Sequence, residues 1–225
     1  MKNRVLVIAA HPDDEALGCS GTIAKHIKAK DQVFIIFMSN GVSSRDGNNL
    51  ESATKLRLNS ARKSCETLKT ENPIFLDFPD NKMDSLPLLD IVQKLEKFVF
   101  DIKPNVVYTH HGFDLNIDHR ITHQAVMTVC RPQPNFSVKA IYTFEVLSST
   151  DWASSSSINS FIPFKFVDIS DTFHQKINSL NCYISELREF PHSRSIESVR
   201  ALSVLRGSTI GVSFAEGFQV ERIIS

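Results

Sequence analysis

The sequence lacks closely spaced cysteines, net charge and long apolar runs, and each absence excludes a class of protein. Its four cysteines lie dozens of residues apart, at positions 19, 65, 130 and 182. That spacing forms no CxxC metal site or small disulfide framework, which favours a reduced, cytoplasmic compartment. Lysine plus arginine and aspartate plus glutamate each total 25, so the net charge of zero predicts no nucleic-acid partner. No segment approaches the roughly 20 apolar residues of a transmembrane helix, which predicts a soluble protein without a membrane span.

The N-terminal residues 1–10 resemble the start of a signal peptide, because a basic stretch precedes an apolar one. The apolar run from Val5 to Ala10 is too short for that role and leads directly into the polar sequence HPDDE. A first strand is the better interpretation. At 225 residues the chain can form one ordinary core, and we expect a single domain over residues 1–225.

Short apolar segments alternate with longer helical patterns, which is typical of parallel strands covered by crossover helices. The expected strands are residues 5–10, 32–38, 73–78, 105–109 and 139–147. The expected helices are residues 16–30, 50–69, 85–101, 119–130, 171–189 and 193–206. The serine-rich residues 148–157 should form a loop or lid, and residues 211–224 a tail. The pattern predicts an α/β fold: a Rossmann-like, doubly wound, mostly parallel sheet with helices on both faces.

Two polar clusters follow expected strands. The sequence AHPDDEALG occupies residues 10–18, after the first strand, and THHGFDLNIDHR occupies residues 109–120, after the fourth. In doubly wound sheets, ligands bind outside the carboxyl ends of the strands. The two clusters are therefore the candidate site.

Residue types in these clusters suit a catalytic Zn²⁺, which takes three imidazole or carboxylate ligands and leaves one position open. His11, Asp14 and His119 could supply that set. Asp13 lies next to a ligand and could act as general base toward a water activated by the metal. Asp118 could accept a hydrogen bond from an imidazole N–H and so orient the ring.

The sequences AHPDDEALGCSGTIAK and DLNIDHR resemble the LmbE/PIG-L family of zinc-dependent N-acetylglucosamine deacetylases. Residues 39–43, 192–195 and 206–218 also resemble segments of that family. The resemblance implies hydrolysis of an acetamido group on a small-molecule N-acetylated sugar or glycoconjugate, with release of acetate and an amine. It also implies that His11, Asp14 and His119 bind the metal and that Asp13 is the base.

One position departs from the family. Several members have a histidine three residues before the last ligand, thought to stabilise the oxyanion, whereas this chain has Asn116. An amide can donate a neutral hydrogen bond but supplies no imidazolium charge. Either Asn116 takes this role in weaker form, or His110 or His111 moves in.

Substrate contacts are expected from two loops. Trp152, in the serine-rich segment, could stack on a sugar ring, and Arg45 and Asp46 could bind sugar hydroxyls or a phosphate. Each has a plain structural alternative: Trp152 could pin its loop, and the two charges could be solvated.

Alternative functions stay open. The Asn116 departure would also suit a non-catalytic relative that binds a sugar or nucleotide sugar, and the same metal set would serve an amidase of another N-acyl conjugate. Similar ligand sets accept iron or other divalent metals. Whether the chain forms a homo-oligomer is open as well. A dinucleotide site is disfavoured, because G-x-G-x-x-G is absent.

Overall fold

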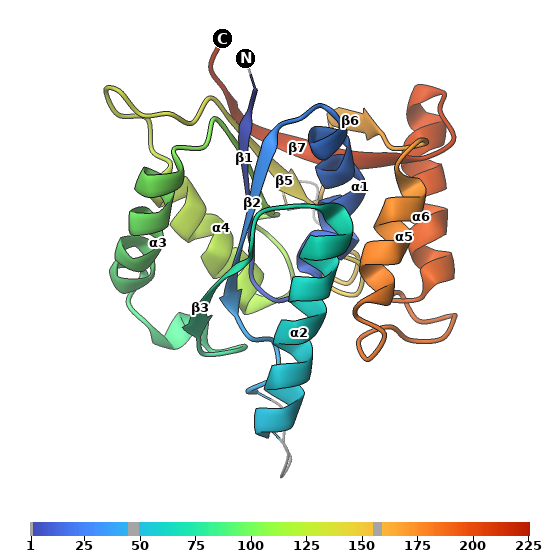
Figure 1. Cartoon of the computed structure of the whole chain (residues 1–225), viewed down its shortest axis with the longest axis horizontal. Coiled ribbons are helices and arrows are strands. Elements are labelled where there is room, and N and C mark those ends of the chain that lie inside the picture. The colour runs from blue at the N-terminus through green and yellow to red at the C-terminus, as the bar shows by residue number, and fades with distance from the viewer. Residues whose placement is uncertain (1, 45–49, 155–158) are drawn as a thin grey trace.

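The computed structural model places a mixed sheet at the centre of the protein and describes residues 2–44, 50–154 and 159–225. In this part of the chain seven strands lie in the order β3-β2-β1-β4-β5-β7-β6 (Figure 1). They are β1 (Arg4–Ala9), β2 (Gln32–Ser39), β3 (Ile74–Phe78), β4 (Val106–His110), β5 (Ala140–Phe144), β6 (Lys165–Asp168) and β7 (Ala215–Ile223). Strands β1 to β5 pair in parallel, whereas β7 pairs antiparallel with both β5 and β6.

Helices cover both faces of this sheet (Figure 1). They are α1 (Asp14–Lys28), α2 (Leu50–Leu68), α3 (Leu88–Ile102), α4 (Ile117–Val129), α5 (Phe173–Asn181) and α6 (Ile196–Ile210), with a 3₁₀ turn at Met83–Ser85. Val5 and Val7 of β1 face the layer of α1, α2, α5 and α6, while Leu6 and Ile8 face α3 and α4. All four side chains are fully buried, because each face has its own helical layer.

The predicted α/β fold with a mostly parallel, doubly wound sheet is confirmed, and three elements differ from expectation. The expected tail, residues 211–224, contains β7, and β6 was not expected. β6 has only four residues and is half-buried at the sheet edge, which leaves little periodic signal. The expected helix 171–189 ends at Asn181, after which residues 182–186 form turns.

Helix α1 is broken at Cys19, whose backbone dihedrals (φ −149°, ψ 15°) are not helical. Just before the break, Gly18 packs against the ring of Phe144 so closely that no Cβ would fit. Glycine therefore allows the first turn of α1, which begins at Asp14, to approach the end of β5.

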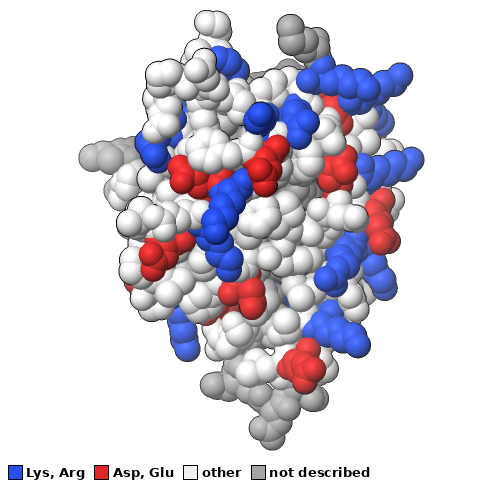
Figure 2. All heavy atoms as spheres, turned by 60° about the vertical axis from the view of Figure 1, so that its left-hand side comes forward, with Lys and Arg blue, Asp and Glu red and all other residues white. Residues whose placement is uncertain are grey.

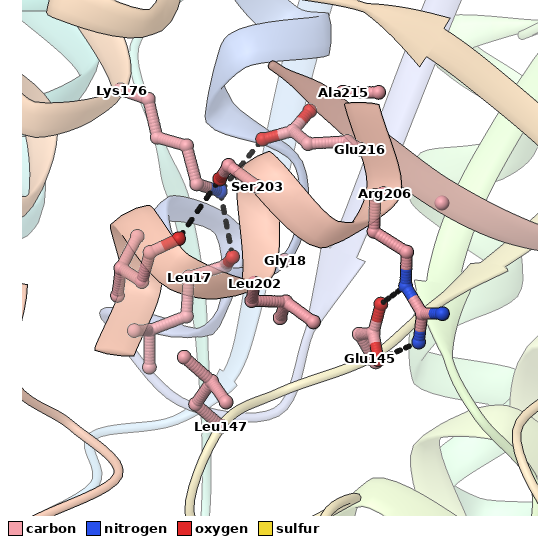
Figure 3. Close-up of a pocket in the computed structure, with 12 residues that line it drawn as sticks. Leu17, Gly18, Glu145, Leu147, Lys176, Leu202, Ser203, Arg206, Ala215 and Glu216 are labelled. Carbon is pink, nitrogen blue, oxygen red and sulfur yellow. Dashed lines mark hydrogen bonds and ion pairs between the residues drawn. The ribbon is translucent and has the colours of Figure 1, made fainter. Parts of the chain in front are cut away.

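A buried ion pair between Lys176 and Glu216 binds backbone groups of α1 on both sides of this break, and Figure 3 shows the pair and its contact with the Leu17 carbonyl. Lys176 of α5 donates to Glu216 of β7 (Nζ–Oε1 2.6 Å) and to two carbonyls of α1, and Glu216 accepts from two α1 amides. The carbonyls are those of Ala16 and Leu17, and the amides those of Gly21 and Thr22. The pair thereby fixes the first turn of α1 relative to α5 and β7.

Surface charge is mixed. Figure 2 shows positive and negative side chains interspersed on one face, without a continuous area of a single sign. Within the described ranges, no helix combines the length and apolar character needed to cross a membrane.

Candidate active site

The two polar clusters meet at the carboxyl ends of β1 and β4, which are parallel neighbours. The Ala10 amide donates to His110 Nε2 at 2.8 Å and joins the two loops directly. The strand order reverses between β1 and β4, so this is the crevice where open α/β sheets bind ligands.

The three predicted metal ligands lie together. One ligand atom from each of His11, Asp14 and His119 lies within 4.8 Å of the other two. His11 Nδ1 and His119 Nε2 are each 3.3 Å from Asp14 Oδ2, and all three side chains are buried. Two imidazoles and a carboxylate form a ligand set that catalytic zinc uses.

Unpartnered atoms in this cluster support a bound cation. Among the residues that the structure describes, Asp14 Oδ1 and His119 Nε2 are buried and have no hydrogen-bond partner. Buried polar atoms are nearly always paired in native proteins, and a bound ion accounts for exceptions of this kind. The residues present therefore fit a divalent cation.

Asp114 orients His119. Its Oδ1 lies 3.1 Å from His119 Nδ1, and its carboxylate accepts hydrogen bonds from the hydroxyls of Ser149 and Thr150. A ring that donates through Nδ1 presents Nε2 to a metal. Burial lowers the pKa of His119, but the carboxylates of Asp14 and Asp114 outweigh it and raise the pKa to about 9.

Asp118, the predicted orienting carboxylate, contacts His11. Its Oδ2 lies 2.9 Å from His11 Nε2, on the opposite side of the ring from Asp14. Two backbone amides after β3 hold this carboxylate, those of Asn81 and Met83. Burial lowers the pKa of His11, but hydrogen bonds to Asp118, Asp14 and Asp80 raise it well above its ordinary value.

A polar pocket of about 100 Å³ lies beside the cluster. His11, Asp13 and Asn116 line it, so the predicted base shares a cavity with a predicted ligand. The other lining residues are Gly41, Ser44, Arg57, Asp80, Asn81 and Arg194. Such a lining suits a substrate rich in hydroxyl and amide groups.

Asp13 is held in a conformation that non-glycine residues rarely adopt, with φ 122°. Arg57 Nη2 lies 3.0 Å from its Oδ1, and Arg194 Nη1 lies 2.9 Å from its Oδ2. The Arg57 contact is not aligned as a hydrogen bond, so Oδ1 is without a hydrogen-bond donor in the described part of the chain. Oδ1 is thus held by an ion pair alone, whereas Oδ2 accepts a hydrogen bond from Arg194.

His110 and His111 lie in different places, because successive residues point to opposite sides of a strand. His110 stacks on His119 with ring centroids 3.9 Å apart. Burial lowers the pKa of His110 well below its ordinary value, so the ring is neutral. His111, a predicted catalytic residue, has Nε2 2.9 Å from the Asn159 carbonyl oxygen and lines another pocket. The structure does not bring His111 to the cluster.

Asn116 both lines the pocket and caps α4. Its Oδ1 accepts the Asp118 amide hydrogen bond at 2.8 Å, and its Nδ2 donates to Asn81 Oδ1 at 3.1 Å. Of the three candidates for oxyanion binding, Asn116 is the one at the pocket.

Of the predicted substrate contacts, the structure describes Trp152, whereas Arg45 and Asp46 lie outside the described residues. Trp152 is 53% exposed and contacts the ring of His192 edge-on, with centroids 5.5 Å apart. It does not line the pocket.

Sequence reasoning gave no role to Asp80, Asp114, Arg57 or Arg194. The rule that polar residues after a strand belong to the site could have found Asp80, which follows β3, and Asp114, which follows β4. Arg57 lies within α2 and Arg194 before α6, where the sequence carries no such signal.

Comparison with protein families matches residues 6–130, more than half of the chain, to the family described as PIG-L: GlcNAc-PI de-N-acetylase. Both polar clusters lie within the match, and the family resemblance is confirmed.

Individual relatives agree with this family. The chain is 31% identical over 135 residues to "Uncharacterized deacetylase YaiS" of Escherichia coli (strain K12), which covers 58% of this chain and 69% of that protein. It is 26% identical over 229 residues to diacetylchitobiose deacetylase of Thermococcus kodakarensis, covering 96% of this chain and 82% of that protein.

A solved structure shows that the fold alone does not fix the reaction. GalB, the 4-carboxy-2-hydroxymuconate hydratase from Pseudomonas putida KT2440, matches with a TM-score of 0.79 at 20% identity, covering 100% of this chain and 99% of its own. The reaction must therefore be argued from the site.

Proposed function

Because the chain belongs to the PIG-L family, we propose that it is a zinc-dependent deacetylase that hydrolyses the acetamido group of an N-acetylated sugar or sugar conjugate, of the N-acetylglucosamine type. The observation that carries the proposal is a buried pair of imidazoles and a carboxylate beside a polar pocket that also contains Asp13. The relatives named as deacetylases support the reaction class.

His11, Asp14 and His119 would hold the cation, with His11 braced by Asp118 and His119 by Asp114. When bound, zinc supplies Lewis-acid polarisation of the amide carbonyl and lowers the pKa of water. The same ligands would accept another divalent metal.

Asp13 is the proposed general base. Its Oδ1, which accepts no hydrogen bond from the described residues, takes a proton from the water that adds to the carbonyl carbon, and returns it to nitrogen as the C–N bond breaks. The products are acetate and a free amine. Arg57 and Arg194 hold the carboxylate in place during both transfers.

Asn116 is the proposed neutral donor to the developing oxyanion, since its amide lines the pocket. Trp152 stays a proposed contact for the part of a sugar conjugate that extends beyond the pocket. We also assign residues 1–225 to one domain, supported by the single sheet that contains all the described strands. The unpaired cysteines support a cytoplasmic location.

A screen for amine release tests the proposal. Purified protein, loaded with Zn²⁺ or treated with chelator, is incubated with N-acetylated sugars, nucleotide sugars and glycoconjugates, and with N-acyl analogues of longer chain. We expect equal amounts of amine and acetate from at least one N-acetyl sugar, only in the metal-loaded sample. Preference for the longer acyl groups would identify an amidase of another conjugate. Stoichiometric binding without amine release would identify a non-catalytic relative.

A further inference from the structure

The backbone of Asp13 is held from several sides. Its φ of 122° is costly for a residue with a Cβ and persists only where the surroundings impose it. The Asp13 carbonyl accepts hydrogen bonds from the amides of Ala16 (3.0 Å) and Leu17 (2.9 Å). The Asp13 amide donates to Glu15 Oε2 at 3.1 Å. The direction of the Asp13 carboxylate therefore depends on where Glu15 is held.

Glu15 is fully buried, and donors from two other elements fix it. Its Oε1 accepts a hydrogen bond from the hydroxyl of Tyr183 at 2.7 Å and another from Ser64 of α2 at 3.0 Å. Ser64 is in turn 2.7 Å from the hydroxyl of Ser179 on α5. These donors hold the buried Glu15 carboxylate in one position, and that carboxylate in turn holds the Asp13 amide.

Tyr183 also supports Asp13 by a second route. The guanidinium carbon of Arg57 lies 5.8 Å from the centre of the Tyr183 ring, and Arg57 contacts the Asp13 carboxylate. Tyr183 is 1% exposed, so neither its hydroxyl nor its ring is at the surface or in contact with substrate. Its hydroxyl reaches the Asp13 backbone through Glu15, and its ring reaches the Asp13 side chain through Arg57.

We propose that Glu15 and Tyr183 are positioning residues for Asp13: together they impose its strained backbone and aim its carboxylate into the pocket. This inference rests on the proposed function, in which Asp13 is the base. A misplacement of about 1 Å at a catalytic group can cost about 10²-fold in rate. Loss of one of the two donors to Glu15 Oε1 should cost less, on the order of tenfold.

Tyr183→Phe is the test variant, because it removes the hydroxyl and keeps the ring beside Arg57. Tyr142→Phe is the matched control: it makes the same change at a buried tyrosine whose hydroxyl makes no hydrogen bond to residues 2–44, 50–154 or 159–225. In Tyr183→Phe we expect kcat about tenfold lower, with KM and metal content within about twofold of wild type. The control should match wild type. Equal kcat in the two variants would overturn the proposal.

A double-mutant cycle with Asp13→Ala tests the route. If Tyr183 acts through Asp13, Tyr183→Phe should cause no further loss of the residual rate in the Asp13→Ala background. A full tenfold loss there would overturn the proposal.

An activity-independent measurement separates this proposal from the proposed function. The ¹⁵N–¹H resonance of the Asp13 amide should shift in Tyr183→Phe and stay in place in Tyr142→Phe. An unmoved resonance in both variants would refute the positioning role. Absence of amine release by the wild-type protein would instead refute the deacetylase proposal.

Discussion

Zn²⁺ loading should release protons, because two of the three proposed ligands are protonated without the metal. Burial lowers the pKa of His119, but Asp14 and Asp114 raise it to about 9. At pH 7, most molecules without the metal therefore carry a proton on this ring. Burial also lowers the pKa of His11, but hydrogen bonds to the carboxylates of Asp118, Asp14 and Asp80 raise this pKa well above its ordinary value.

A metal ligand must be deprotonated, so the cation displaces each of these protons. Each proton released makes the apparent affinity rise about tenfold per pH unit, so the proton on His119 alone gives about tenfold between pH 6.5 and 7.5, and release from His11 as well makes the rise steeper. Competition with a chromophoric chelator across this range measures the slope. Calorimetry in two buffers of different ionisation enthalpy counts the protons. A rise of less than about tenfold over that pH unit would refute the reasoning, since less than one proton would then leave.

Asp114→Asn provides the control, because the amide keeps the shape of the side chain and removes one of the two charges, those of Asp14 and Asp114, that raise the pKa of His119. It should release fewer protons and bind Zn²⁺ about 10- to 100-fold more weakly at pH 8. The raised pKa of His119 also determines how the stability of the metal-free protein changes with pH. The contribution of His119 to the metal-free fold is complete below the unfolded pKa of about 6.5 and is lost as the pH rises through about 9. Urea unfolding of chelator-treated wild type and Asp114→Asn should show this loss mainly in the wild type.

Three further substitutions test separate parts of the structure. Asp13→Ala should lower kcat by about 10²- to 10⁴-fold while elemental analysis finds wild-type zinc; loss of the metal would instead make Asp13 a ligand. Asn116→Ser should lower kcat by about 10²-fold, because the donor to the oxyanion is lost. Its melting temperature should not change, because serine also caps the Asp118 amide. An unchanged kcat would exclude Asn116 from the oxyanion role. Lys176→Met should cost about 3–5 kcal/mol in urea unfolding, because Glu216 stays buried without its partner; a cost below about 1 kcal/mol would contradict the buried pair.

The sequence predicted the central fold well, because local patterns reflect burial directly. Strands β1 to β4 begin and end within one residue of the expected ranges, since each is a short apolar run between polar loops. β7 was not recognised because only its first half, which pairs with the short edge strand β6, is buried, whereas its second half, which pairs with β5, is half-buried or exposed. Its strand character comes from pairing with distant residues rather than from its own periodicity.

The residue types of the candidate site could also be predicted from the sequence, because metal and proton chemistry restrict them to a few side chains in two short loops. The residues that hold these side chains in place could not be predicted. Arg57 reaches Asp13 from the middle of α2, Arg194 reaches it from near the C-terminus, and Asp118 contacts His11 across 107 residues of chain. No local spacing encodes such contacts.

By itself, then, the sequence determined which strands form the parallel part of the sheet and which side chains could bind a cation, because hydrophobic periodicity and donor chemistry are properties of short segments. Only the tertiary structure decided which carboxylate contacts which imidazole, that His111 lines a different pocket, and that Glu15 and Tyr183 hold the backbone of Asp13. These are distances between segments far apart in the chain, and packing of the helices on the sheet sets them.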